Sequence, residues 1–202
     1  MKQTSLLIWF LVSFFSLRAE DYFFLALEDS YYENPANWFP AYPGDQISDS
    51  NRVVLMADAS FGSYDIHIAG SMEITLGVRL HSALGSLQVM PSGTLDNQGS
   101  LMVMRIKNYG TLYNRLSALI YLYEYIAYDG AITQNACSAV FETIAHIENS
   151  GRFDNYSRCI AGSDFSNTCI FNQIYASRLE VSGRTLLSTG CLMYRQAGRR
   201  RR

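Results

Sequence analysis

The chain repeats one seven-residue pattern, Asn-x-Gly-x-Leu-x-Asn, at nearly constant spacing. Copies occupy residues 108–114 and 149–155, a degenerate copy occupies 128–134, and an earlier one occupies 91–97. Their glycines are 17, 20 and 21 residues apart. A period of about 20 residues is typical of stacked structural units, each of which needs a neighbour to bury its apolar side. The repeat therefore constrains the fold before any other feature does.

Apolar residues alternate with polar ones around these repeats, as in Ile66 and Ile68, Met72 and Ile74, and Leu87 and Val89. This period of two is the pattern of half-buried strands, and no useful length of the chain has helical periodicity. Residues 65–198 are thus predicted to form an all-β parallel β-helix, or β-solenoid, of roughly six coils.

Within each repeat, the glycine is expected to make the bend and the leucine to point inward. The final Asn tolerates left-handed backbone and can bond to its equivalent in the next coil. We therefore predict a structural ladder of stacked amides. Use of these amides as ligands for a substrate is the alternative. The ladder residues are Asn97, Asn114, Gln134 and Asn155.

Residues 20–64 differ from the rest of the mature chain. They contain three of the four prolines (Pro35, Pro40 and Pro43) and Trp38. Proline cannot donate to a sheet ladder, so it is suited to chain segments that enter or cover a sheet. Because a solenoid needs its first open rung shielded, we predict that residues 20–64 form an N-terminal cap.

The first 19 residues have the features of a secretory signal peptide. Lys2 precedes a ten-residue apolar stretch at 6–15, and Ala19 offers a cleavage site. The stretch is too short to cross a hydrocarbon core of about 30 Å. We predict a secreted or cell-surface protein without a transmembrane segment after signal removal. A retained N-terminal anchor is the alternative.

The body of the chain is acidic. Sixteen Lys and Arg oppose 18 Asp and Glu overall; Lys2, Arg18 and residues 199–202 contribute six of the basic residues, so residues 20–198 carry ten against 18. A body with a net charge of −8 and scattered arginines has no footprint for nucleic acid. Residues 199–202 are interpreted as a solvated basic tail.

Four cysteines in an exported chain favour disulfides over metal ligation. Cys137 and Cys159 are 22 residues apart, as are Cys169 and Cys191. Because this interval approximates the repeat period, both pairs are predicted to join adjacent coils. A Cys159–Cys169 bridge within one coil is the rival pairing. No Cys-x-x-Cys pair suggests zinc, and we expect neither metal nor cofactor.

The most suggestive surface feature is a tyrosine-rich strand around residues 120–128. At period two, Tyr121, Tyr123 and Tyr125 share one side, and if Leu122 and Ile126 face the core, the three tyrosines line the outside as a candidate binding row. Rigid aromatic side chains with polar tips suit contact with glycans or proteins. Packing of these rings against the next coil is the alternative.

No motif for a nucleophilic, metal-dependent or nucleotide-dependent enzyme occurs in the required context. The acidic residues are dispersed along the chain, whereas cleavage of polysaccharides by a β-helix needs clustered carboxylates or a Ca²⁺ site. The sequence does not decide whether the chain is an enzyme, and we favour a role without catalysis.

Residues 34–38 (NPANW) and 43–47 (PGDQI), followed by Gly/Asn rungs, resemble the opening of exported bacterial surface proteins. The resemblance implies a right-handed parallel β-helix and an extracellular, adhesin-like or matrix-like role. It covers the mature chain to about residue 155 but rests on short motifs, and the arginine tail stands where an anchoring domain is expected. Adhesion or matrix contact with surface glycans or other surface proteins is the leading prediction. A carbohydrate-binding or polysaccharide-cleaving β-helix is the alternative.

Overall fold

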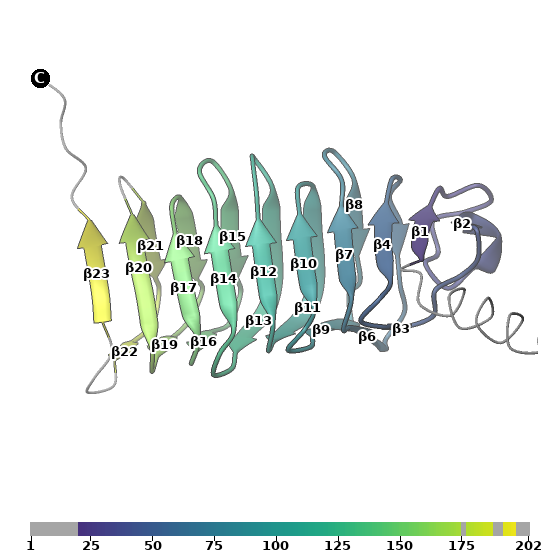
Figure 1. Cartoon of the computed structure of the whole chain (residues 1–202). Helices are drawn as coiled ribbons and strands as arrows, with labels where there is room; N and C mark the ends of the chain where they lie inside the picture. Colours follow the sequence, from purple (N-terminus) through teal and green to yellow (C-terminus); the bar gives the residue numbers. More distant parts are fainter. Residues whose placement is uncertain (1–19, 175–176, 188–191, 197–202) are drawn as a thin grey trace, which may run out of the picture.

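The computed structural model describes residues 20–174, 177–187 and 192–196, which form an elongated stack of short strands (Figure 1). The predicted parallel β-solenoid is confirmed, with about seven turns where the sequence indicated roughly six. Within the described residues, the one helical element is the 3-10 turn η1 (Pro35–Asn37).

One side of the stack is a ten-stranded sheet, which we call the first face. Its strands are parallel and in register, except that β2 pairs antiparallel with β1 at one end. In spatial order they are β2 (Trp38–Phe39), β1 (Asp21–Phe24), β4 (Arg52–Leu55), β7 (Ser71–Ile74), β10 (Thr94–Asn97), β12 (Thr111–Asn114), β14 (Ile132–Asn135), β17 (Arg152–Asn155), β20 (Ile170–Ile174) and β23 (Leu192–Gln196).

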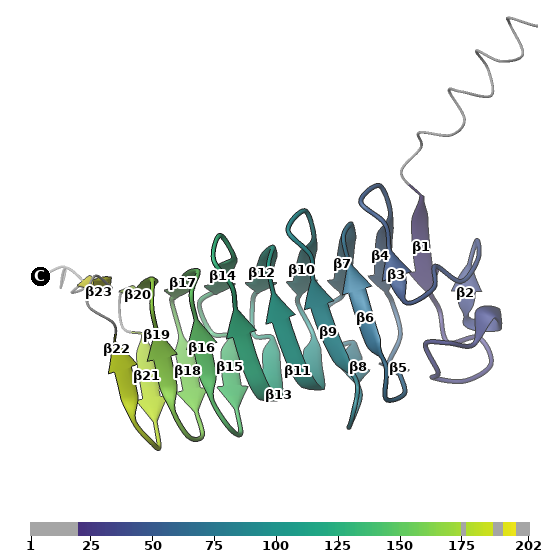
Figure 2. The ribbon, with the colours of Figure 1, turned by 90° about the horizontal axis from the view of Figure 1, so that it is seen from below.

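The remaining strands form two further faces, seen from below in Figure 2. β11 (Ser100–Asn108) and β13 (Leu119–Ala127) are long enough to contribute to both. The second face has β5 (Ala59–Ser60), β8 (Arg79–His81), the first halves of β11 and β13, β15 (Val140–Thr143), β18 (Arg158–Ala161) and β21 (Arg178–Val181). The third face has β3 (Gln46–Ile47), β6 (Asp65–Ile68), β9 (Ser86–Val89), the second halves of β11 and β13, β16 (Ile147–Asn149), β19 (Phe165–Asn167) and β22 (Thr185–Leu187).

The corner between the second and third faces explains why period two fails in the long strands. In β11, Met104 and Arg105 are consecutive residues outside the core, and in β13 the same is true of Tyr123 and Glu124. Two successive outward residues turn the strand around the core and reverse the alternation beyond that point. Tyr125 is therefore fully buried, and the prediction that it joins Tyr121 and Tyr123 on the outside is wrong.

The core is a column of inward side chains along the stack axis. It is largely aliphatic near the N-terminus, as at Met72, Leu95 and Leu112, which are successive register partners. Toward the C-terminus it becomes aromatic, where Phe141, Phe153 and Tyr125 make edge contacts at centroid distances of 4.9 to 6.1 Å. Such edge-to-face pairs stabilise beyond their buried area.

Buried asparagines stack at the corner between the first and second faces. Asn97, Asn114 and Asn135 each donate through Nδ2 to Oδ1 of the next Asn, at 2.9, 2.9 and 2.8 Å, and the series ends at Asn155. The predicted ladder is thus present at Asn97, Asn114 and Asn155, but the prediction that Gln134 belongs to it is wrong. Gln134 is the Cα partner of Tyr113 and Asp154 and faces outward, while its neighbour Asn135 takes the ladder position.

Residues 20–64 contribute rungs as well as an end piece. β4 and β3 pair in parallel with β7 and β6, so they belong to the regular stack. η1 and β2 lie at the outer end, beyond β1 (Figure 1). The arrangement keeps the N-terminal cap as a prediction for the segment around η1 and β2, with a shorter extent than 20–64.

Candidate binding surfaces on the sides of the solenoid

The NPANW segment is hydrogen-bonded to residues 28–32 at the N-terminal end of the stack. Asn37 is fully buried: its Oδ1 accepts from the backbone N–H groups of Glu28 and Asp29, and its Nδ2 donates to Asp29 Oδ1 and the Tyr31 carbonyl. Trp38 Nε1 donates to the Tyr32 carbonyl at 2.6 Å. The polar groups of Asn37 and Trp38 are therefore occupied by partners within the chain.

The middle of the second face carries an apolar patch. Its half-buried or exposed side chains come from the three adjacent coils of β11, β13 and β15. Tyr123 is 44% exposed and Ile144, which follows β15, is 51% exposed. The apolar patch consists of Met102, Met104, Leu119, Tyr121, Tyr123, Val140 and Ile144.

A shallow groove of about 210 Å³ runs across this patch. Tyr121 and Tyr123 line it together with His81, Met102, Met104 and Ile144. Two of the three predicted tyrosines are thus brought together at a concave, mainly apolar surface. Large exposed apolar areas on soluble proteins commonly mark interaction sites.

Tyr125, the third tyrosine, fills a polar gap inside the core. Its hydroxyl lies within hydrogen-bonding reach of Thr133 Oγ1 and accepts from Asn108 Nδ2 at 3.2 Å. Burial raises the pKa of Tyr125 to about 12, an effect that the Thr133 and Asn108 hydrogen bonds oppose. The residue has a structural role and is inaccessible to a ligand.

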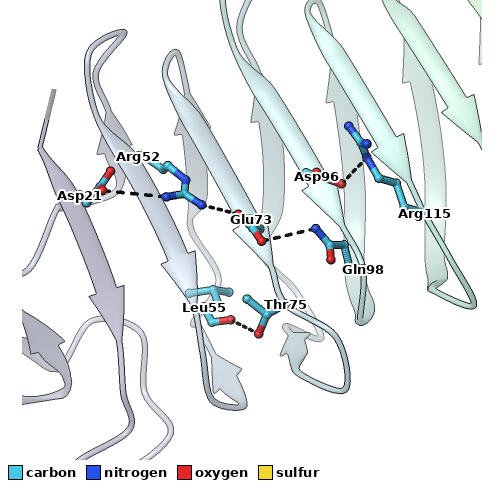
Figure 3. Close-up of polar contacts among 8 residues, drawn as sticks. All are labelled: Asp21, Arg52, Leu55, Glu73, Thr75, Asp96, Gln98 and Arg115. Carbon is cyan, nitrogen blue, oxygen red and sulfur yellow. Dashed lines mark hydrogen bonds and ion pairs between the residues drawn. The ribbon is translucent and has the colours of Figure 1, made fainter.

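The first face presents a row of polar side chains near its N-terminal end (Figure 3). Arg52 pairs with Glu73 at 2.7 Å and lies 3.9 Å from Asp21. Gln98 Nε2 donates to Glu73 Oε1 at 3.4 Å, and Arg115 Nε lies 2.9 Å from Asp96 Oδ1. Each acid in this row therefore has a cationic partner.

Glu73 and Asp96 are direct register partners on β7 and β10. Neighbouring strands are about 4.8 Å apart, which brings these two outward carboxyl groups close together. Burial raises the pKa of Asp96 above its usual value; Arg115 opposes this, and the charge of Glu73 adds to it. The sequence indicated dispersed acids, but Glu73 and Asp96 occupy equivalent places after Gly70 and Gly93, and that alignment could have revealed the pair.

The third face holds a charged cluster in which each member has an internal partner. Arg105 pairs with Glu124, whose other oxygen lies 2.8 Å from His146 Nε2. His146 Nε2 is also 3.5 Å from Glu148. This cluster is therefore polar and internally compensated, in contrast to the apolar patch.

The predicted Cys137–Cys159 disulfide is wrong. Cys137, Cys159 and Cys169 are free thiols, so the rival Cys159–Cys169 bridge is absent too. Asn135 pairs with Asn155, which places Cys137 in the turn level with residue 157, whereas Cys159 points into the core opposite Phe141. Burial raises the pKa of the Cys159 thiol well above its usual value. Cys191, the predicted partner of Cys169, lies outside the described residues.

The part of the chain that the structure describes contains no group of three His, Cys, Asp or Glu side chains placed to hold a metal ion. It also contains no helix long and apolar enough to cross a membrane. The predicted signal peptide at 1–19 and the basic tail at 199–202 lie outside this part.

Comparison with protein-family models found no match, and searches of curated proteins and of solved structures found no significant similarity. The resemblance of residues 34–47 to exported surface proteins thus stays a prediction.

Proposed function

We propose that this chain is a secreted or cell-surface β-solenoid that acts without catalysis in adhesion or extracellular matrix contact. The observation that carries the proposal is the apolar patch on the second face, continuous over three coils and bordered by charged residues. Inward residues fill the core and the asparagine ladder, so the outward positions of this face are those left for a partner.

The patch has the composition of a binding surface. Tyr121 and Tyr123 present rigid rings with polar tips, and Met102 and Met104 supply adaptable apolar contact beside them. A flat sheet surface repeated every coil suits an extended partner such as a surface protein or a glycan. The charged cluster of the third face, by contrast, is already paired internally.

The test is binding of the secreted chain to cell surfaces and to immobilised matrix proteins and glycans. The Tyr121→Ser/Tyr123→Ser variant is expected to bind at least about tenfold more weakly, because central aromatic residues dominate interface energies. Tyr113→Ser, which removes an outward tyrosine from the first face, is the matched control and should bind as the unmodified chain does. Unchanged binding of the double variant would refute the proposal.

The alternative is a polysaccharide-binding or polysaccharide-cleaving site at Glu73 and Asp96. Two adjacent carboxyl groups, one with a raised pKa, have the composition of a general acid and its partner. Release of reducing ends from neutral and acidic polysaccharides, with and without a chelator, tests for cleavage. If cleavage occurs, Asp96→Asn and Glu73→Gln should each lower its rate by about 100-fold or more. No release from any substrate in the presence of folded protein would exclude cleavage at this pair.

A further inference from the structure

We propose that the partner of the second face is a second copy of the chain, paired face to face with the two solenoid axes antiparallel. This inference rests on the proposed function, because it uses the same apolar patch and names its occupant. The evidence is that the outward residues of the face are complementary to themselves about a two-fold axis between β11 and β13.

Two columns of outward residues run along the second face, with one residue per coil and about 4.8 Å between coils. Both are fixed by the parallel register of β5, β8, β11, β13, β15 and β18. From the N-terminal end, the first column is Asp58, Arg79, Ser100, Leu119, Val140 and Arg158. The second column is Ser60, His81, Met102, Tyr121, Glu142 and Ile160.

A two-fold axis that lies in the interface and runs along the strands reverses the order of the coils. It leaves each residue at its position along the strand. β11 of one copy then covers β13 of the other, β8 covers β15, and β5 covers β18. Met102 faces Tyr121 of the second copy, and complementary polar residues meet on either side of this apolar centre.

The residues that meet are His81, whose ring can donate a hydrogen bond, with the carboxylate of Glu142, and Asp58 with the oppositely charged Arg158. Arg79 faces Val140 of the second copy, within side-chain reach of its Glu142. Acidic Asp58 lies at one end of the first column and basic Arg158 at the other. An antiparallel arrangement therefore places Asp58 of each copy opposite Arg158 of the other. An arrangement with parallel axes instead places each charge near its own equivalent, and like charges in contact are unfavourable.

The side chains that border the patch are available for such contacts. Arg79, His81 and Glu142 have no side-chain ion pair among the described residues, whereas Glu124, Glu148 and Asp164 of the third face each have one. Arg158 pairs with Glu180 at 2.6 Å but is half exposed. Pairing two copies therefore gives partners to charges that lack them and covers Tyr121 and Tyr123 together.

The face spans only a few coils, so we expect a reversible dimer with a dissociation constant on the order of micromolar. The experiment measures the molar mass of the secreted chain by sedimentation velocity over a range of concentrations. Glu142→Lys removes the acceptor of His81 and places a second cation near Arg79, and His81→Glu places two carboxylates opposite one another; each change should weaken the dimer by about tenfold or more. Asp65→Lys, the same change of charge on the third face, is the control and should leave the dimer intact.

Mixing the two variants is the decisive measurement. In a mixed pair, native His81 faces native Glu142 at one contact, and the introduced lysine faces the introduced glutamate at the other. Native mass spectrometry should therefore detect a heterodimer as stable as the unmodified dimer. If each variant is impaired and the mixture does not recover, the antiparallel two-fold pairing is wrong.

Failure of this inference can be told apart from failure of the proposed function. A chain that stays monomeric at all concentrations, while Tyr121→Ser/Tyr123→Ser lose surface binding, overturns the dimer and keeps the adhesive face. A chain that dimerises as described, but whose tyrosine variant binds surfaces normally, keeps the dimer and overturns the adhesive role of the patch.

Discussion

Two corners of the solenoid use buried asparagines in the same way, but only one does so without interruption. At the corner between the first and second faces, Asn97, Asn114, Asn135 and Asn155 form a continuous series. At the corner between the third and first faces, Asn108, Asn149 and Asn167 occupy the equivalent places, but Ala127 lies between Asn108 and Asn149.

The interruption changes the hydrogen bonds on both sides of Ala127. Asn108 Nδ2, which has no amide oxygen opposite it, donates to Tyr125 and Thr133. Asn149 Oδ1 is buried and without a partner, because Ala127 has no amide to donate to it. In the continuous ladder each amide bonds to the amides of the neighbouring coils. In the interrupted ladder, Asn108 bonds to core hydroxyl groups in place of an amide, and the Asn149 oxygen has no donor.

The largest effect should come from breaking the continuous ladder. Asn135→Ala removes bonds to Asn155 Oδ1 and the Arg158 carbonyl, and it leaves Asn114 Nδ2 with the Val140 carbonyl as its one remaining acceptor. We expect a loss of about 3 kcal/mol in the free energy of unfolding, since buried polar groups are costly to leave unpaired. Urea denaturation measures this. Gln134→Ala, one residue away and outward-facing, should cost less than about 0.5 kcal/mol; equal costs at both positions would contradict the register.

That register also shows where the sequence was sufficient and where it was not. The periodicity predicted a stacked all-β fold because the inward positions alternate and the glycines recur. It misplaced Gln134 because the copy at 128–134 was aligned through Gly130. In the structure, Ile132 N–H bonds to the Gly110 carbonyl, so Ala131 rather than Gly130 precedes the strand. The turn there has four residues with Gly130 at φ +80°, whereas Asn108 is followed by a two-residue turn.

The errors at the candidate sites have the same origin. Turn lengths and corners vary between coils, and a period counted along the chain does not record them. Cys137 lies inside the four-residue turn 136–139, whereas the equivalent turn before β18 has two residues, so the 22-residue interval joins a turn to a core position. Tyr125 was misassigned because the corner at Tyr123 and Glu124 is invisible to strict alternation. Tyr121 and Tyr123, which precede that corner, were placed correctly on the surface.

The broken ladder should be less sensitive to loss of a rung. Asn149→Ala removes hydrogen bonds to Asn167 Oδ1 and to the Gly151 and Ile170 carbonyls, but it also removes the unsatisfied Asn149 Oδ1. We therefore expect a cost of about 2 kcal/mol, below that of Asn135→Ala. Parallel urea titrations compare the two variants. A larger cost for Asn149→Ala would show that the interruption at Ala127 does not weaken this corner.

The next prediction concerns the Tyr125 hydroxyl, which accepts from Asn108 in place of an amide at position 127. Tyr125→Phe keeps the edge contacts with Phe141 and Phe153 but removes the bonds to Asn108 and Thr133, at a cost of about 1 kcal/mol near neutral pH.

The cost of Tyr125→Phe in unfolding free energy should also depend on pH. Tyr125 has a pKa of about 12 in the fold and near 10 when unfolded. Its proton is therefore retained by the folded state and lost by the unfolded state as pH rises from 10 to 12, which lowers stability in that range. Tyr125→Phe lacks this dependence, so the advantage of the unmodified chain in unfolding free energy, about 1 kcal/mol near neutral pH, should fall across that window and then change sign. A constant difference would mean that the hydroxyl is less buried than the structure indicates.

The smallest and most specific effect should come from repairing the interruption. Ala127→Asn alone places an amide where the Tyr125 hydroxyl already serves Asn108, so crowding should destabilise the fold by about 1 kcal/mol. In combination with Tyr125→Phe, the new amide can accept from Asn108 and donate to Asn149 Oδ1, which completes the ladder. We expect the double variant to be more stable than the sum of the single changes by about 0.5 to 1 kcal/mol. Simple additivity in this cycle would show that the Tyr125 hydroxyl and the missing amide at Ala127 are independent, and that the two corners differ for another reason.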